Sequence, residues 1–172
     1  MIPVAQTKFG RGGNCFPACV ASMLEMKLED VPDFCNVYPN SWFVEFACWL
    51  KKFGLTAILW KGGWGDGMKQ VFRDTPLLAC GNSPYHFGIK HQVIHMNGVL
   101  IHDPIDEGLG LEGEPEDWIA FVCIDPSKVV KEYEEGKNKY KDALAACGIC
   151  LRCLGKGCAS CDFVDRRADD IS

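Results

Sequence analysis

The sequence predicts an α+β domain in which helices come first and a mostly antiparallel sheet follows. Apolar residues recur at helical spacing up to about residue 50. After Gly54 the pattern changes to short apolar runs separated by turn residues, which is typical of strands. Because the two kinds of pattern are segregated along the chain, we expect N-terminal helices packed on one antiparallel sheet.

The N-terminal part is predicted to hold two helices and a short helical turn between them. Residues 16–26 carry apolar side chains at helical spacing, and Pro17 is tolerated there because it falls in the first turn. Residues 28–34 indicate a short turn of helix. A stronger helix is expected over residues 41–50, ending near Gly54.

The rest of the domain is predicted to be strands and loops. The expected strands are residues 55–60, 76–80, 91–95, 99–102 and 118–124. The glycine-rich segments 61–67 and 108–113 lack the features of phosphate-binding loops, so both are expected to be ordinary loops. Trp60, just before the first segment, and Trp64, within it, either line a cleft or fill the core.

Composition excludes several classes of partner. The 172 residues suit one domain with an appendage, and 48% hydrophobic content is ample for a packed core. A net charge of −5 without a basic stripe argues against nucleic acid. No apolar stretch approaches the roughly 20 residues of a membrane helix, and residues 1–6 do not resemble a signal peptide. We therefore expect a soluble intracellular protein with no membrane partner.

The eleven cysteines fall into two groups. Five crowd the end of the chain: Cys147, Cys150, Cys153, Cys158 and Cys161. Six are scattered through the predicted core elements: Cys15, Cys19, Cys35, Cys48, Cys80 and Cys123. In a reducing compartment scattered thiols behave as small buried hydrophobes, so we expect core positions for all six except Cys15.

Cys15 is the candidate nucleophile. It follows a Gly-Gly-Asn approach at the start of the first predicted helix. A thiol at a helix N-terminus is acidified by the helix dipole, which favours the thiolate. The alternative is a buried helix cysteine with no chemistry. Cys19, one helical turn further on, is expected to be such a core residue.

A β-hairpin is predicted downstream, because two apolar runs are joined by Asn97-Gly98. A two-residue turn there would place His91 and Asp103 on opposite faces of the sheet and separate them. A three-residue loop over 96–98 would pair His91 directly with Asp103, so that the carboxylate holds the imidazole. The catalytic interpretation therefore requires the three-residue loop.

The other histidines offer alternatives. His86 is the rival base, although Gly88 weakens the strand that it would need. His95 and His102 are expected to be partly buried and without a catalytic role. Asp103 precedes a proline, and Asp-Pro is also common where a strand simply ends in a turn.

Gln6 is the candidate oxyanion donor. Its amide lies nine residues before Cys15, so it reaches the site only if residues 10–13 fold back. The alternative is a solvated polar residue in a first strand.

Several motifs together carry a resemblance. They are residues 3–6, Gly-Gly-Asn-Cys-Phe-Pro-Ala-Cys-Val-Ala-Ser-Met-Leu-Glu at 12–25, Leu-Glu-Asp-Val-Pro-Asp-Phe at 28–34, and the segments 81–84, 91–93, 102–104 and 108–111. Over about residues 1–125 the chain resembles small papain-like cysteine-protease-type proteins of phages and bacteria. More distantly, it is similar to bacteriocin-processing peptidases, whose cysteine, histidine and aspartate follow the same order.

The resemblance implies a papain-like fold and a thiol hydrolase that acts on a protein or peptide. It implies Cys15 as nucleophile, His91 as base, Asp103 as the residue that orients it, and Gln6 as oxyanion donor. The reaction would cleave a peptide or isopeptide bond, or transfer the acyl group. One departure is Ile105, where the small proteins often have histidine, which puts a substrate-side detail in doubt.

The resemblance leaves a second function class open. A non-enzymatic assembly component of a virion or complex could keep the same fold. The location implied is accordingly the cytoplasm of a bacterial host cell or a virion.

Residues 126–172 are predicted to form an extension outside the resemblance, with a charged helix followed by the cysteine cluster. Closely spaced thiols of this kind, namely Cys147, Cys150, Cys153, Cys158 and Cys161, favour zinc or an iron-sulfur cluster. Disulfides or free thiols are the alternative. The extension is expected to dock the domain onto a virion or host protein.

Overall fold

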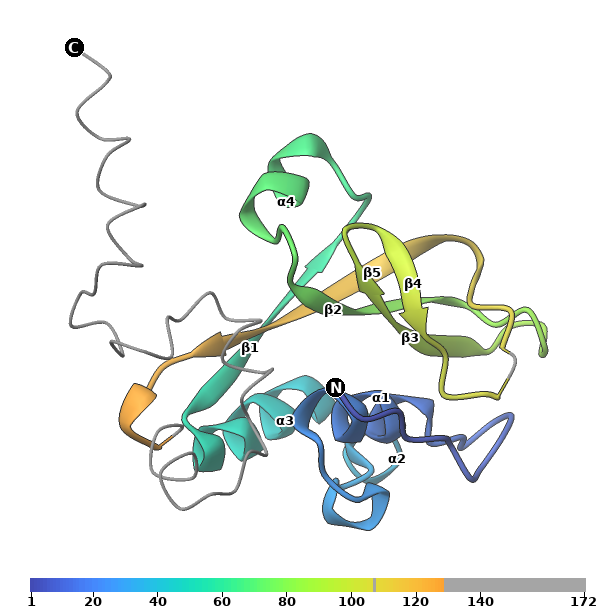
Figure 1. Cartoon of the computed structure of the whole chain (residues 1–172). Helices are drawn as coiled ribbons and strands as arrows, with labels where there is room; N and C mark the ends of the chain where they lie inside the picture. Colours follow the sequence, from blue (N-terminus) through green and yellow to red (C-terminus); the bar gives the residue numbers. More distant parts are fainter. Residues whose placement is uncertain (107, 129–172) are drawn as a thin grey trace.

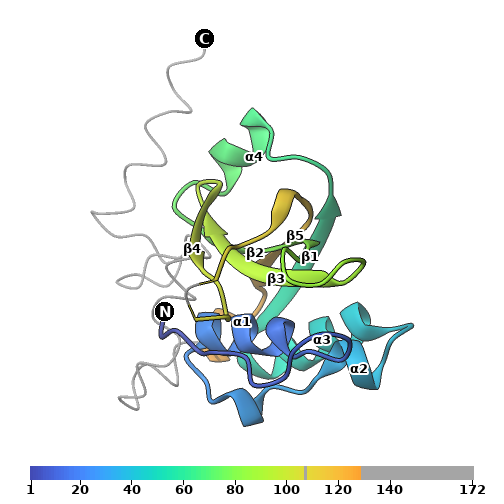
Figure 2. The ribbon, with the colours of Figure 1, turned by 90° about the vertical axis from the view of Figure 1, so that its right-hand side faces the viewer.

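The computed structural model describes residues 1–106 and 108–128, and it has an α+β architecture (Figure 1). Three helices, α1, α2 and α3, lie against one face of a five-stranded sheet, and α4 lies on the opposite side (Figure 2). The predicted α+β class, with N-terminal helices packed on an antiparallel sheet, is therefore confirmed for the described residues. Most of the predicted extension, 126–172, lies outside them.

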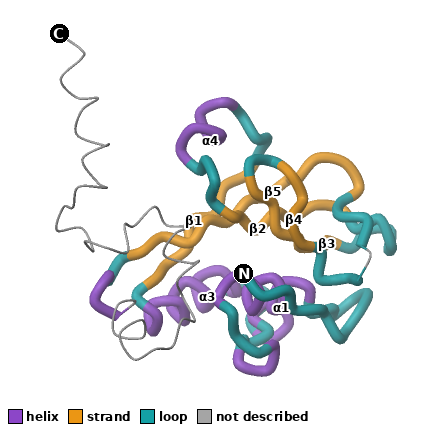
Figure 3. The backbone as a smooth tube through the Cα atoms, in the orientation of Figure 1, coloured by secondary structure: helices purple, strands orange, loops and turns teal. Residues whose placement is uncertain are grey.

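The helices fall close to the expected positions. Their bounds are α1 Cys15–Leu24, α2 Phe34–Val37, α3 Trp42–Leu50 and α4 Asp66–Val71, with 3-10 turns η1 Leu28–Asp30 and η2 Lys51–Phe53. The chain leaves η2 at Gly54, whose φ of 73° is easily adopted by glycine. Figure 3 shows that helix dominates the chain up to this point and strand dominates after it.

All the strand pairs in the sheet are antiparallel, and the strand order is β1-β5-β2-β3-β4. The bounds are β1 Leu55–Lys61, β2 Pro76–Asn82, β3 Lys90–Met96, β4 Val99–His102 and β5 Glu112–Cys123. The long β5, the last strand along the described chain, lies inside the sheet between β1 and β2. In the described part of the chain, no helix has the length and apolar character needed to span a membrane.

The main core lies between the sheet and the helices. Phe46 of α3 is fully buried and makes edge-to-face contacts with Phe16 and Phe34 at centroid distances of 5.0 and 5.5 Å. Leu78, Ile94 and Ile119 face them from the three central strands. This core fixes the height of α1 above β3, where the candidate site is located.

A second, aromatic core covers the other face of the sheet. Trp118 lies against Trp60 and Trp64, and Trp60 also stacks on Phe72, which follows α4. The two tryptophans beside the glycine-rich segment therefore fill a core. They do not line the cavities beside Cys15.

Both glycine-rich segments differ in part from the expected loops. Residues 61–67 run into helix α4, which begins at Asp66 and is supported by an ion pair from Lys69 to Asp66 at 3.1 Å. Residues 108–113 run into β5, which begins at Glu112. The polar first half of β5 lacks the apolar alternation that marks a strand, because it is largely exposed.

The hairpin turn differs from the one that the catalytic interpretation required. Met96 pairs with Val99, and Asn97 and Gly98 both have positive φ, 55° and 79°, as in a two-residue turn. The register then shifts by one residue, because His95 pairs with Leu100 but Ile94 pairs with His102. The three-residue loop was therefore wrong, and so was the conclusion that a two-residue turn must separate His91 from Asp103.

The unpaired residue in this shift is Ile101, which bulges out of β4. Since side chains alternate along a strand, one extra residue moves every following side chain to the other face. Asp103 consequently returns to the face of His91. The bulge at Ile101, and not the turn, therefore brings Asp103 and His91 to the same face.

Candidate active site

Cys15 is the first residue of α1, as predicted. Asn14 precedes it and is buried. The Asn14 Oδ1 accepts hydrogen bonds from the backbone N–H groups of Thr7 and Lys8 at 3.0 and 2.8 Å, and Nδ2 donates to the Thr7 hydroxyl at 3.1 Å. The Asn14 side chain thus binds residues 7 and 8 of the preceding N-terminal arm and does not cap α1.

The segment between this arm and Cys15 folds back on itself. Gly13 N–H donates to the Gly10 carbonyl at 3.0 Å, and Asn14 N–H donates to the Lys8 carbonyl at 3.2 Å. A side chain at Gly13 would bring Cβ to 3.0 Å from the Gly10 oxygen, which explains the glycine there. The reversal is the condition under which Gln6 could approach Cys15.

Gln6 is buried and lines the same cavity as Cys15 and His91. Its backbone N–H donates to the Pro104 carbonyl at 2.8 Å, which ties the arm to the segment after β4. Its side-chain Nε2 donates to the Lys8 carbonyl at 3.0 Å, and one of its two hydrogens remains for another acceptor. The alternative of a solvated residue in a first strand is wrong, since Gln6 is buried and lies outside any strand.

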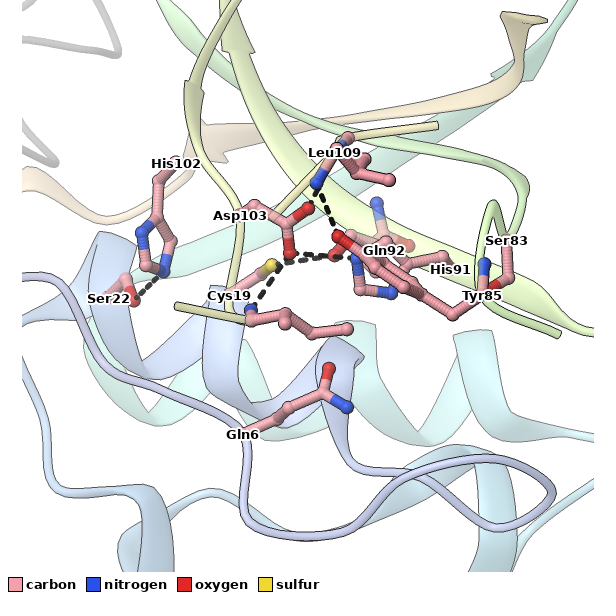
Figure 4. Close-up of polar contacts among 12 residues, drawn as sticks. Gln6, Cys19, Ser22, Ser83, Tyr85, His91, Gln92, His102, Asp103 and Leu109 are labelled. Carbon is pink, nitrogen blue, oxygen red and sulfur yellow. Dashed lines mark hydrogen bonds and ion pairs between the residues drawn. The ribbon is translucent and has the colours of Figure 1, made fainter. Parts of the chain in front are cut away.

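His91 and Asp103 form a hydrogen-bonded pair. The distance from His91 Nε2 to Asp103 Oδ1 is 2.9 Å, and each side chain is only 4% exposed (Figure 4). Asp103 also accepts hydrogen bonds from the backbone N–H groups of Ile105 and Gly110 at 2.8 and 2.9 Å. Burial would raise the pKa of Asp103, but these bonds outweigh burial and lower it.

The surroundings of His91 make its imidazole a stronger base than a free imidazole. Burial would lower the pKa of His91, but its hydrogen bonds with Asp103 and with the Cys15 thiol outweigh burial and raise the pKa to about 9. Because Nε2 faces Asp103, the ring nitrogen left for Cys15 is Nδ1. The structure thus links Asp103 to His91 and His91 to Cys15 by successive hydrogen bonds.

Two cavities meet at Cys15 and His91. The smaller one is about 330 Å³ and is also lined by Gln6, Tyr85 and Ile105. The larger one is about 550 Å³ and lies between the sheet and the first residues of α1 and α3. A substrate could therefore cross the thiol and occupy a cavity on either side of it.

The remaining histidines have other surroundings. His102 Nε2 lies 3.1 Å from the Ser22 hydroxyl (Figure 4) and 3.2 Å from the Val4 carbonyl. His95 packs edge-on against Trp118. His86 is exposed and lies in the turn between β2 and β3, outside any strand, although it lines the smaller cavity. Among the four histidines, His91 is the one that bonds to a carboxylate in the part of the chain that the structure describes.

The other cysteines only partly fit the expectation of core positions. Cys19 is fully buried and donates to the Gln92 carbonyl at 3.2 Å, and burial raises its pKa well above the usual range. Cys35 and Cys48, in contrast, are exposed, so placing them in the core was wrong. Cys48 lies on the solvent side of α3, whose buried residues include Phe46 and Trp49.

Two supporting contacts were not anticipated from the sequence. Tyr85 lies edge-on to His91 at a centroid distance of 6.0 Å and accepts a hydrogen bond from Leu109 N–H (Figure 4). Gly108 lies so close to Asp103 that a Cβ there would be 2.2 Å from the carboxylate carbon. The Gly-Leu-Gly sequence at 108–110 was the only sign of this approach, because the contact depends on a turn after β4.

The predicted metal ligands in the tail lie outside the described residues: Cys147, Cys150, Cys153, Cys158 and Cys161. Within residues 1–106 and 108–128, no group of three or more His, Cys, Asp or Glu side chains is arranged to hold a metal ion.

No protein-family model, curated protein or solved structure matches this chain.

Proposed function

We propose that this chain is a papain-like thiol hydrolase that cleaves a peptide or isopeptide bond through an acyl-enzyme on Cys15. The observation that carries the proposal is the buried His91–Asp103 pair, whose second ring nitrogen is left for a thiol at the start of a helix. A nucleophile, a base and a residue that orients the base are the parts that such a reaction needs.

The first half of the reaction forms the acyl-enzyme. His91 Nδ1 takes the proton of the Cys15 thiol, and the thiolate attacks the substrate carbonyl. The Asp103 carboxylate keeps the second ring proton on Nε2 and stabilises the imidazolium. The imidazolium then gives its proton to the leaving amine, and the C–N bond breaks.

The second half releases the acyl group. His91 takes a proton from water, the resulting hydroxide attacks the thioester, and the proton returns to the Cys15 sulfur. An amine in place of water would give acyl transfer by the same steps. The free hydrogen of Gln6 Nε2 and the backbone N–H of Cys15 are the proposed donors to the oxyanion.

The test is selective alkylation of Cys15 in the full chain. At neutral pH we expect iodoacetamide to modify Cys15 faster than Cys48, an exposed thiol of the same protein. His91→Ala should abolish this advantage. Cys19→Ala is the matched control, since it removes a thiol one helical turn away that does not take part.

Peptide mapping by mass spectrometry would read out each site separately. If Cys15 reacts no faster than Cys48 in the wild-type protein, the hydrolase proposal fails, and the domain would act as a component of an assembly. If Cys15 does react selectively, cleavage of a peptide library by wild type, with Cys15→Ala as the inactive control, would identify the substrates.

A further inference from the structure

The larger cavity beside Cys15 has a row of three side chains on its sheet wall. Cys80 of β2 pairs with Gln92 of β3 on one side and with Asp117 of β5 on the other. Paired residues point to the same face of a sheet, and all three line this cavity. The row therefore runs across three strands beneath the space next to the nucleophile.

Gln92 brings an unused hydrogen-bond donor to this wall. Gln92 is only 5% exposed, and its side-chain Nε2 is buried without a hydrogen-bond partner in the described part of the chain. A buried polar group without a partner is costly, so a partner supplied by a ligand would stabilise the complex.

Asp117 brings an acceptor at the other end of the row. It is partly buried, and within residues 1–106 and 108–128 no cation lies within ion-pair distance of its carboxylate. Between the two, the Cys80 thiol has its pKa raised to about 12 by burial and by Asp117, so it is neutral at physiological pH. The wall therefore offers a donor and an acceptor separated by a neutral side chain.

We propose that this cavity is the specificity pocket of the enzyme and that it takes a substrate residue with a primary amide side chain, glutamine or asparagine. The amide carbonyl accepts a hydrogen bond from Gln92 Nε2, and the amide NH2 donates to the Asp117 carboxylate. This assignment rests on the proposed hydrolase function, because the cavity is next to Cys15 and His91.

The spacing of the row suits such a side chain. Residues paired across neighbouring strands lie about 5 Å apart, so Gln92 and Asp117 are roughly 10 Å apart at Cα. A primary amide with a hydrogen bond of about 2.9 Å on each side spans roughly 8 Å between its two partners. The rest of the lining is largely apolar, with Phe16, Trp42, Leu59 and Ile119 available to contact an aliphatic stem.

The charges of the lining favour an amide over a cation. Arg11 and Lys90 line the same cavity, so the field of Asp117 is offset by two positive charges. Lys90 in turn bonds to Glu116, which leaves the pocket without a strong net charge. An apolar substrate side chain would leave both Gln92 and Asp117 without partners, and sites of this kind discriminate against such substrates.

The test compares glutamine with methionine, which has a similar length but no amide. A positional library of acetylated peptides is incubated with the full-length protein, and cleavage is measured by mass spectrometry. At one position next to the cleaved bond, we expect kcat/KM for glutamine to exceed that for methionine by roughly tenfold or more. Gln92→Leu and Asp117→Ala should each reduce this ratio to near one.

Glu112→Ala is the matched control, because Glu112 is an exposed carboxylate of the same strand that does not line the cavity. The ratio is taken within each variant, so it does not depend on how much of the protein is folded. Selective cleavage at lysine or arginine that Asp117→Ala abolishes would overturn the proposal, since the pocket would then bind a cation.

Two further results separate this inference from the proposed function. Cleavage without any amide preference, by a protein whose Cys15 is selectively alkylated, overturns the pocket assignment alone. An unreactive Cys15 together with no cleavage overturns the hydrolase proposal and the pocket assignment with it.

Discussion

Replacing Gly108 by alanine should disable the site without replacing any residue that takes part in the proposed reaction. Gly108 has no positive φ, so its backbone accepts alanine. The obstacle is Asp103, since the new Cβ would be 2.2 Å from both Cγ and Oδ2 of the carboxylate. The three nearest atoms to the new Cβ all belong to Asp103, so the substitution acts first on this side chain.

The size of the effect follows from these distances. A carbon cannot stay 2.2 Å from the carboxylate, so Asp103 must move by roughly 1.3 Å or more to reach ordinary contact distance. The 2.9 Å bond to His91 would then exceed hydrogen-bonding length. The Asp103 hydrogen bond helps to raise the pKa of His91 against burial, so that pKa should fall from about 9 when the bond is lost. Misplacement of about 1 Å commonly costs roughly a hundredfold in rate.

The assay is the rate of Cys15 alkylation by iodoacetamide between pH 5 and 9, with NMR titration of the His91 ring as a second readout. Gly63→Ala is the matched control, because a Cβ there meets nothing within 4 Å. We expect Gly108→Ala to alkylate ten to a hundred times more slowly than the control near pH 7. If both variants match the wild-type rate and His91 keeps its raised pKa, the Asp103 support for His91 is refuted.

Other expected outcomes follow from the same structure. The raised pKa of His91 stabilises the fold fully below about pH 6.5. The free energy of unfolding should therefore fall by roughly 3 kcal/mol as the pH rises from about 6.5 through 9, and denaturant titrations of His91→Ala should lack this fall. The lowered pKa of Asp103 has the opposite sign, and its contribution should be lost in acid. Asn14→Ala removes three hydrogen bonds from the N-terminal arm, so it should cost about 2 to 3 kcal/mol and make the arm more sensitive to protease. Phe46→Ala should cost about 3 to 5 kcal/mol in thermal unfolding, because this ring is fully buried among aromatic neighbours. The cysteine spacing at 147–161, outside the described residues, predicts from the sequence alone that elemental analysis will find zinc or iron in the full chain, and a metal-free folded protein would contradict that proposal.

The α+β fold class and the position of Cys15 at a helix start could be predicted from local patterns. Helical spacing around Phe46 and the change of pattern after Gly54 depend on side chains near in sequence, and the structure follows them. The position of Cys15 at a helix start was predictable for the same reason. What failed was the detail of pairing, since no local pattern marks Ile101 as a bulge.

Contacts between distant segments account for the remaining gaps. Gln6 is buried because its backbone bonds to Pro104, nearly a hundred residues later. The larger cavity joins side chains from α1, α3 and the central strands, so its lining is defined only once the sheet order is known. Cys35 and Cys48 were misplaced because the side of a helix that faces solvent depends on what packs against the other side.

The bulge at Ile101 also affects how the molecule meets other chains. Strand β4 is an edge of the sheet, and a regular edge strand is a template on which another chain can add a strand. An extra residue interrupts that template within four residues of the turn. Deleting Ile101 would therefore give β4 a more regular edge on which another chain could add a strand. It would also move the Asp103 side chain to the face of the sheet opposite His91. Selection for solubility and selection for chemistry would act on the same backbone irregularity.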